Sequence, residues 1–272
     1  MIEIRDTRPE FLSDWVEFHI SRYERDISQG ELSALIEGAF GEEPEEGVLS
    51  VTWNLLKEKQ GLYLPKPFLI NELNIENQSL TGLAKTVQQS CLILALFGSR
   101  DQTIQALFEN ISHLAIQAYF KGESELFAWR GNDIETRLRN LAGRLGEKFC
   151  ASPPQTTKDA GVDVVAWKPF PDRRSGKTVL LAQCASGRNW EDKHSVPLRR
   201  WNQYFLWAND PVDAYTIPYF IPAGKWHWVC RDFGIFFDRI RLVNLLSGIE
   251  NFELNQDLEN WLSAWLSENE IN

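Results

Sequence analysis

Two short apolar runs carry the residues of this chain whose types and spacing could do chemistry. In the first run Asp163 stands between Val162 and Val164, and in the second Gln183 follows the apolar stretch 179–182. If the two runs pair as strands, these polar side chains meet at one end of the pair. A carboxylate beside an amide oxygen is typical of a metal site, and we predict one that supports phosphodiester cleavage.

The alternation of side chains along a strand sets the predicted ligands. Gln183 and Ala185 share one face, whereas Cys184 turns its side chain away and could offer its carbonyl oxygen to a metal. Magnesium prefers hard oxygen ligands and keeps several waters, so Asp163, Gln183 and the Cys184 carbonyl predict bound Mg²⁺ or Mn²⁺. The structural alternative is an aspartate that satisfies turn amides and a glutamine bonded to a neighbouring backbone.

The same residues resemble a known superfamily. Asp159-Ala160-Gly161-Val162-Asp163 and, about twenty residues later, Gln183-Cys184-Ala185 look like the catalytic core of PD-(D/E)xK nucleases, in particular Mrr-type restriction endonucleases, whose pattern is D-x-G-x-D and then Q-x-K. The resemblance covers roughly residues 130–210. It implies a restriction-endonuclease-like core, divalent-metal-dependent DNA cleavage and a role in defence against foreign DNA. It also matches Glu135 to an acidic residue that the helix before the first strand often supplies.

The chain departs from that pattern at Ala185, which stands where the resemblance expects a lysine. Lys193 is the predicted replacement, because a helix that begins after Gly187 could fold the lysine side chain back toward the metal. Lys168 and Lys177 suit this role less well, since they lie at the turn of the hairpin. If no lysine reaches the metal, the domain is a non-cleaving interaction subunit of a defence or repair complex.

Charge is distributed unevenly along the 272 residues, whose net charge is -10. Residues 1–60 hold fourteen acidic and six basic side chains, whereas residues 168–200 hold eight basic and three acidic ones. The overall charge disfavours a non-specific nucleic-acid coat protein, so any contact with DNA must be local. The predicted phosphate contacts are Lys168, Arg173, Arg174, Lys177 and Arg188.

Other functional classes find little support in the sequence. Four scattered cysteines disfavour a disulfide framework, and the four histidines lack zinc-ligand spacing. Ser175-Gly176-Lys177-Thr178 imitates the end of a P-loop, but Pro171 replaces the first glycine and a strand-like run follows. An ATPase is therefore disfavoured, and a protein partner would have to supply recognition or energy. No signal or membrane span is recognised, so we expect a cytoplasmic protein, whose oligomeric state, homo-oligomer included, stays open.

Helices and strands must position these residues. Apolar spacing predicts helices within 10–40, at 83–97 and at 103–120, a helix capped by Asp133 that ends near Gly146, and a closing helix at 251–267. Gly41 to Gly47 and residues 98–101 are predicted to be a loop and a turn. Predicted strands lie at 162–167, 178–185, 213–221 and 234–242, with the first two forming a hairpin.

Two charged or aromatic stretches near the end of the chain complete the prediction. Trp226-His227-Trp228 alternates as a strand would, so one of its faces could be exposed to a partner or a base. Residues 238–241 place charges at a sheet edge, where they serve structure or touch phosphate. The predicted fold is α/β, with a mixed central sheet flanked by helices and a mainly helical N-terminal region. We divide it into a partner or regulatory region, 1–125, and a nuclease domain, 126–272.

Overall fold

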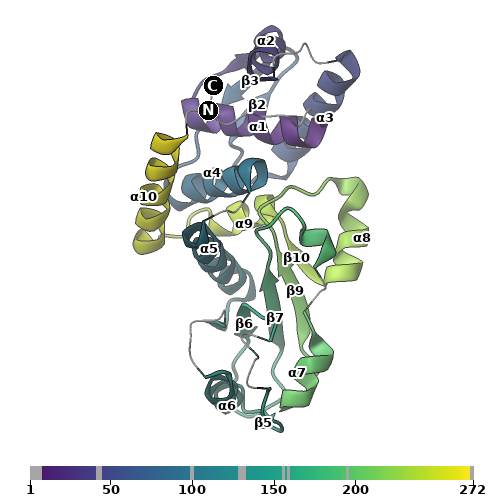
Figure 1. Cartoon of the computed structure of the whole chain (residues 1–272), viewed down its shortest axis with the longest axis vertical. Helices are drawn as coiled ribbons and strands as arrows, with labels where there is room; N and C mark the ends of the chain where they lie inside the picture. Colours follow the sequence, from purple (N-terminus) through teal and green to yellow (C-terminus); the bar gives the residue numbers. More distant parts are fainter. Residues whose placement is uncertain are drawn as a thin grey trace. The chain divides into compact units, whose positions relative to one another are not determined.

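The protein has a mixed α/β fold, as predicted (Figure 1). The computed structural model describes residues 8–40, 45–98, 101–127, 133–154, 157, 160–193 and 196–269. Within these residues, the strands form a five-stranded, a three-stranded and a two-stranded sheet. None of the helices in these ranges is long and apolar enough to cross a membrane.

The chain folds into two compact units that are not contiguous in sequence. Unit 1 comprises Met1–Leu107, Pro218–Pro222 and Asp238–Asn272, and unit 2 comprises Phe108–Ile217 and Ala223–Phe237. This division differs from the single boundary predicted near residue 125. The physical reason is that the C-terminal helix packs against a helix of the N-terminal half and places Leu262 in the same core as Trp15.

Unit 1 is mainly helical around a small antiparallel sheet. Its helices are α1 (Pro9–Tyr23), α2 (Gln29–Phe40), α3 (Glu46–Leu62), α4 (Gly82–Phe97), α9 (Arg239–Leu246) and α10 (Phe252–Glu268). Its strands are β1 (Ile27–Ser28), β2 (Phe68–Ile70) and β3 (Asn74–Asn77), in the order β1-β3-β2. The apolar faces of α1, α3, α4 and α10 close over one core, in which Leu12, Leu56 and Leu92 are fully buried.

Unit 2 is built on a mixed sheet with the order β10-β9-β7-β6-β4. Its strands are β4 (Glu123–Leu126), β6 (Val164–Trp167), β7 (Val179–Cys184), β9 (Val212–Thr216) and β10 (Ile235–Phe237), and a separate pair is β5 (Lys148–Phe149) with β8 (Phe205–Leu206). β6 and β7 form the predicted antiparallel hairpin, whereas β7, β9 and β10 run parallel. The helices are α6 (Ile134–Leu145), α7 (Leu198–Tyr204) and α8 (Ala223–Phe233), together with α5 (Gln102–Phe120), which begins in unit 1.

Helix boundaries in unit 2 follow the predicted capping residues. The Asp133 carboxylate accepts hydrogen bonds from the backbone N–H groups of Glu135 and Thr136 at the start of α6. Gly146 ends the helix with a φ of 70°, and a Cβ atom there would meet the Arg173 carbonyl oxygen at 2.6 Å. Glycine is therefore required at this position, both for its φ and for the close approach of the loop.

The C-terminal strand predictions were wrong in three places. Trp226 to Trp228 lie in α8, because three alternating residues do not distinguish a strand from a helix. The strand predicted at 213–221 ends at Thr216. The strand predicted at 234–242 is only β10, since the Asp238 carboxylate accepts the Arg241 N–H and begins α9.

In the N-terminal half, α3 and the three-stranded sheet were not predicted, and α3 begins inside the loop expected at 41–47. Residues 41–44 of that loop lie outside the described residues, as do residues 99–100 of the predicted turn. The short strands β1, β2 and β3 hold only two to four residues each. Segments of this length show too few alternating positions to be recognised by periodicity.

A buried cluster of charges ties the helices of unit 1 together. Arg239, predicted to lie at a sheet edge, is fully buried, and its Nη2 atom contacts Asp14 Oδ1 at 2.5 Å and Glu17 Oε2 at 3.1 Å. Lys59 is also fully buried and contacts the same two carboxylates, at 2.5 and 3.2 Å. The cluster thus joins α1, α3 and α9 with two positive and two negative charges.

The remaining polar atoms of the cluster are bonded as well. The Tyr63 hydroxyl donates to Glu17 Oε1 at 2.5 Å, and Gln88 donates to the same oxygen at 2.9 Å. Burial alone would raise the pKa values of Asp14 and Glu17, but the charges of Arg239 and Lys59 outweigh burial and lower both. Both carboxylates therefore stay ionised inside the unit, and each depends on its cations.

Replacing Arg239 by alanine should destabilise unit 1 strongly, because it leaves two buried carboxylates with one cation. We expect the free energy of unfolding to fall by about 3–5 kcal/mol. Urea denaturation followed by circular dichroism measures the change. The control is Arg241→Ala, which removes an exposed arginine from the same helix and should change the value by about 0.5 kcal/mol at most. Equal effects of the two variants would contradict a structural role for the cluster.

Candidate functional site

Asp163 lies directly before β6, where three hydrogen bonds hold it. Its N–H donates to the Ala182 carbonyl at 2.8 Å, and its carbonyl accepts from the Phe127 N–H at 2.6 Å. Its carboxylate oxygen Oδ2 accepts the N–H of Cys184 at 2.7 Å. The side chain is half-buried. These bonds place the carboxylate at the end of β7, where the sequence analysis expected it.

A tight turn at Gly161 precedes Asp163. Gly161, the glycine of the D-x-G-x-D pattern, has a φ of 76°, and a Cβ atom there would lie 3.1 Å from the Pro197 ring. Both constraints favour glycine. Asp159, the first aspartate of the pattern, lies outside the described residues. The glycine of the pattern therefore has a local structural reason in this chain.

Gln183 lies on β7 between the two residues that bond Asp163. The register of the hairpin ends with Val164 opposite Ala182, and the Asp163 N–H donates to the Ala182 carbonyl. The Asp163 carboxylate accepts the N–H of Cys184, the residue after Gln183. Gln183 also pairs with Tyr215 on β9 and is half-buried. The fold thus brings together Asp163, Gln183 and the backbone of Cys184.

The surroundings of Asp163 show the effect of its negative charge. Burial raises the pKa of the Cys184 thiol well above its usual value, and the nearby Asp163 carboxylate raises it further. Hydrogen bonds from the hydroxyl groups of Thr216 and Ser112 to the sulfur lower this pKa only in part. Burial and then Asp163 also raise the pKa of Tyr215. A thiol held protonated in this way is a poor nucleophile, which makes nucleophilic catalysis by Cys184 unfavourable.

The predicted ligands are of the type that magnesium prefers, but they are too few to complete its coordination. All three predicted ligands are hard oxygens, which Mg²⁺ prefers, but only the Asp163 carboxylate carries charge. Among the described residues no group of three or more His, Cys, Asp or Glu could hold a metal. An ion here would draw its other ligands from water and phosphate, as Mg²⁺ often does.

Glu135 occupies the first turn of α6 and is engaged locally. Its carboxylate contacts Arg139, one turn along, at 2.6 Å. Hydrogen bonds with Ser152 and then Arg139 lower its pKa. These partners are not predicted site residues, and they indicate that Glu135 stabilises the start of α6. A role for Glu135 beside the metal stays a prediction.

Ala185 and Lys193 lie on the segment that leaves the end of β7. Ala185 is fully buried, and its N–H donates to the Thr216 carbonyl at 2.9 Å. The helix predicted after Gly187 is a single 3₁₀ turn, Trp190–Asp192. Lys193 follows it, half-buried, and donates its backbone N–H to the Trp190 carbonyl. The reach of its ammonium to Asp163 stays a prediction, as does the phosphate contact of exposed Arg188.

The basic loop of the β6–β7 hairpin lies at the opposite end of the strands from Asp163. Lys168 follows the last residue of β6, so it stands five residues, or about 16 Å along the strand, from Asp163. Lys168, Arg173 and Arg174 are exposed, and Arg174 pairs with Asp172 at 2.7 Å. If they contact phosphate, they do so well away from Asp163.

Lys177 has a different position from its basic neighbours. It is buried, and its ammonium donates to the carbonyl oxygens of Leu145, Arg173 and Arg174 at 2.5, 3.3 and 2.6 Å. An ammonium has three protons, so these acceptors use its whole capacity. Leu145 ends α6, where a cation is favourable. The structure therefore assigns Lys177 to holding the hairpin loop on the helix end and not to phosphate.

The charge of the chain is divided between the two units. Unit 2 holds seventeen lysines and arginines against fourteen aspartates and glutamates, a net +3. The rest of the chain holds eleven against twenty-four, a net -13. The sheet that carries Asp163 therefore belongs to the only unit with a positive balance, which suits contact with a polyanion.

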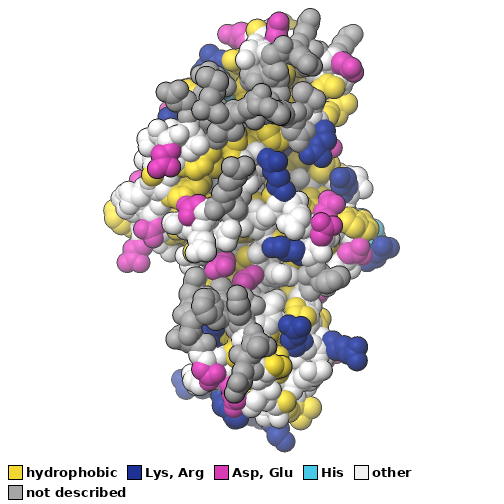
Figure 2. Space-filling view, in the orientation of Figure 1, with side chains coloured by type: hydrophobic (Ala, Val, Ile, Leu, Met, Phe, Trp, Pro, Cys, Tyr) yellow, Lys and Arg dark blue, Asp and Glu magenta, His cyan; other side chains and the backbone are white. Residues whose placement is uncertain are grey.

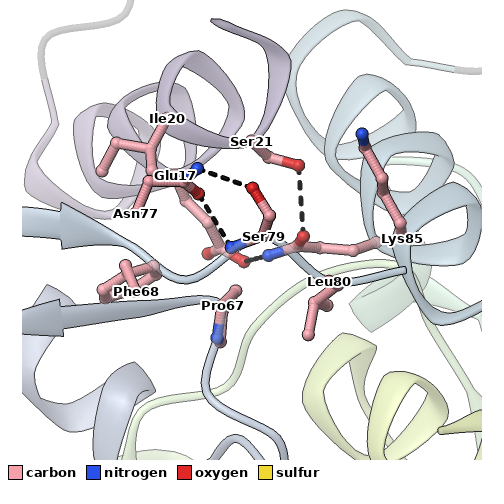
Figure 3. Close-up of a pocket in the computed structure, with 10 residues that line it drawn as sticks. Glu17, Ile20, Ser21, Pro67, Phe68, Asn77, Ser79, Leu80 and Lys85 are labelled. Carbon is pink, nitrogen blue, oxygen red and sulfur yellow. Dashed lines mark hydrogen bonds between the residues drawn. The ribbon is translucent and has the colours of Figure 1, made fainter. Parts of the chain in front are cut away.

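Unit 1 contains a pocket beside Glu17 that is too narrow to hold a water molecule (Figure 3). Its polar side chains are bonded to one another. Gln88 connects Glu17 with Ser21, and the Asn77 amide donates to the Ser79 hydroxyl. These groups therefore support the buried cluster of unit 1, and the pocket is a weaker candidate for chemistry than the edge of the sheet at Asp163.

Comparisons with known proteins give little direct guidance. No protein-family model matches the sequence, and no curated protein matches it. One solved structure, described as MspJI restriction endonuclease in complex with a 27-mer oligonucleotide, is similar over 71% of this chain and 40% of that one, with 13% identity and a TM-score of 0.31. The chain thus spans less than half of that structure, and so low a TM-score does not establish a shared fold.

Replacing Lys177 by methionine tests its assigned structural role. We expect the free energy of unfolding to fall by at least about 1–3 kcal/mol, because buried carbonyl groups lose their donor. Thermal or urea denaturation gives this value, and Lys168→Met, at an exposed position, is the control. A phosphate-binding lysine would show the opposite pattern, with normal stability and weaker binding to DNA.

Proposed function

We propose that unit 2 is a divalent-metal-dependent DNA endonuclease. The observation that carries the proposal is the hydrogen bond from the Cys184 N–H to the Asp163 carboxylate, which places this carboxylate at the end of β7, next to Gln183 in the chain. The resemblance to PD-(D/E)xK nucleases connects this pair with phosphodiester hydrolysis. The positive balance of the unit supports a nucleic-acid substrate.

In the proposed mechanism, Asp163, Gln183 and the Cys184 carbonyl hold Mg²⁺ or Mn²⁺. The ion, when bound, polarises the scissile phosphate and lowers the pKa of the attacking water. The Cys184 N–H orients the Asp163 carboxylate through its Oδ2 atom. Lys193 neutralises the charge that develops on the phosphate.

A second function from another class is a non-cleaving interaction subunit of a defence or repair complex. Two observations favour it. Ala185 is buried where the pattern expects a lysine, and the described residues contain no group of three or more His, Cys, Asp or Glu that could hold a metal. In this alternative the acidic unit 1 binds a protein partner. For the nuclease we propose a role in defence against foreign DNA, with a protein partner that supplies recognition or ATPase activity.

Asp163→Asn should abolish cleavage, since it removes the only charged ligand and keeps a side chain of similar shape. We expect the rate of plasmid nicking in Mg²⁺ or Mn²⁺ to fall roughly 100-fold or more, because metal assistance contributes several kcal/mol to such a reaction. Asp210→Asn, at an exposed position of the same unit, should cleave normally. Circular dichroism verifies that both variants are folded. A folded, inactive wild type would favour the non-cleaving subunit.

Lys193→Ala tests whether Lys193 replaces the lysine that the nuclease pattern expects at position 185. We expect cleavage to slow by roughly 100-fold, a typical effect of removing one group that stabilises transition-state charge, with little change in DNA affinity. Lys168→Ala, at the far end of the hairpin, should cleave at the wild-type rate. Single-turnover kinetics on a short labelled duplex separate the chemical step from binding. Unchanged cleavage by the Lys193 variant would remove Lys193 from the mechanism.

A further inference from the structure

We propose that the outer face of α8 binds an unpaired nucleic-acid strand, with Trp228 as the residue on which a base stacks. The inference rests on the proposed function in one respect, namely that the substrate approaches the Asp163 edge of the sheet. It adds a binding surface and the form of nucleic acid that this surface recognises. Neither the PD-(D/E)xK pattern nor the charge of the hairpin loop points to this helix.

The topology places the start of α8 at the edge of the sheet where Asp163 lies. α8 connects β9 to β10, which run parallel, so the helix must return against the strand direction. Gly234, directly after the helix, lies against Asp213 near the beginning of β9. The first turn of α8 is therefore at the other end, where β7 and β9 finish with Cys184 and Thr216.

A continuous aromatic cluster links the candidate site to the surface of α8. The Tyr215 ring, from the β9 residue paired with Gln183, lies 4.8 Å from the Phe233 ring. Trp190, on the segment before Lys193, lies 5.6 Å from the same ring. Trp228 packs edge-on against Phe233 at 6.3 Å and is 41% exposed. Trp228 is thus the outermost ring of a rigid cluster whose inner members adjoin Gln183.

Cationic side chains accompany this exposed ring. Lys225 and Arg231 stand three residues before and after Trp228, so they flank it on one side of the helix, and both are exposed. His227 is exposed as well, and Arg231 contacts its acidic neighbour Asp232 at 3.3 Å. Figure 2 shows basic and histidine side chains with acidic ones at the edge of the molecule where α8 lies.

An exposed indole between two cations suits a strand whose bases are accessible. Every base has a π face that can stack on an aromatic side chain, and the flanking cations can follow the phosphates. In a duplex the base faces are covered by neighbouring base pairs, so stacking on the same ring would add little to the affinity. We therefore assign α8 to an unpaired segment, such as a frayed or displaced strand beside the site of cleavage.

The test is fluorescence anisotropy of a labelled 20-nucleotide single strand and of the matching blunt duplex, with the full-length protein and EDTA present to prevent cleavage. We expect Trp228→Ala to weaken binding of the single strand by about tenfold and of the duplex by less than about twofold. Trp228→Phe should recover most of the affinity, because it retains an aromatic face. The control is Phe252→Ala, which removes an 82% exposed ring from α10 in unit 1 and should change neither affinity.

The outcomes separate the inference from the proposed nuclease activity. Equal losses for single strand and duplex, no loss on Trp228→Ala, or no binding of single strands by the wild type would each overturn the assignment of α8. A change in oligomeric state on Trp228→Ala, measured by sedimentation, would overturn it in favour of a protein contact. Absence of cleavage with a selective loss of single-strand binding would reject the nuclease and retain the α8 surface.

Discussion

The hydrogen bond from the Cys184 N–H to the Asp163 carboxylate is the contact on which the candidate site depends. At this position the backbone ladder between β6 and β7 ends, and a side chain takes the place of the next carbonyl acceptor. The same carboxylate is thus part of the sheet and part of the site. Because β7 is a central strand, its end is held by β6 on one side and by β9 on the other. The position of Asp163 is therefore set by the most buried part of unit 2.

The carboxylates of unit 1 and of unit 2 have different surroundings. In unit 1, two carboxylates and two cations neutralise one another, and removal of either sign leaves an uncompensated charge. In unit 2, Asp163 is half-buried, and burial and then the charge of Asp163 raise the pKa values of Cys184 and Tyr215. Groups with perturbed pKa values gather at functional sites, which supports the end of β7 as the candidate site.

The sequence was sufficient for the elements whose signals are local. The Asp133 cap, the end of α6 at Gly146 and the hairpin between β6 and β7 depend on residues close in the chain. Arg239 could not be predicted as a core residue, because its partners lie more than two hundred positions earlier. The sequence likewise did not distinguish Lys177 from the exposed basic residues of the same loop. Its burial depends on the end of α6, thirty-two residues away.

The candidate site likewise combines features that depend on neighbouring residues with features that depend on distant ones. The position of Asp163 near the end of β7 follows from the hairpin between β6 and β7, which depends on residues close in the chain. The distance between Asp163 and the basic loop also follows from the hairpin, since the loop must lie at its other end. The sequence predicted an exposed face in the segment 226–228, but the connection of Trp228 to the site depends on Phe233 and Tyr215 and on α8 being a helix.

The discontinuity of unit 1 has a consequence for biosynthesis. Ribosomes deliver the chain from the N-terminus, and domains usually fold as they emerge. Unit 2 is complete once residue 237 has been made, whereas unit 1 still lacks α9 and α10. Until Arg239 arrives, Asp14 and Glu17 have Lys59 as the only cation of their cluster. The segment that begins the chain thus finishes folding last, and the sheet that holds Asp163 can form before it.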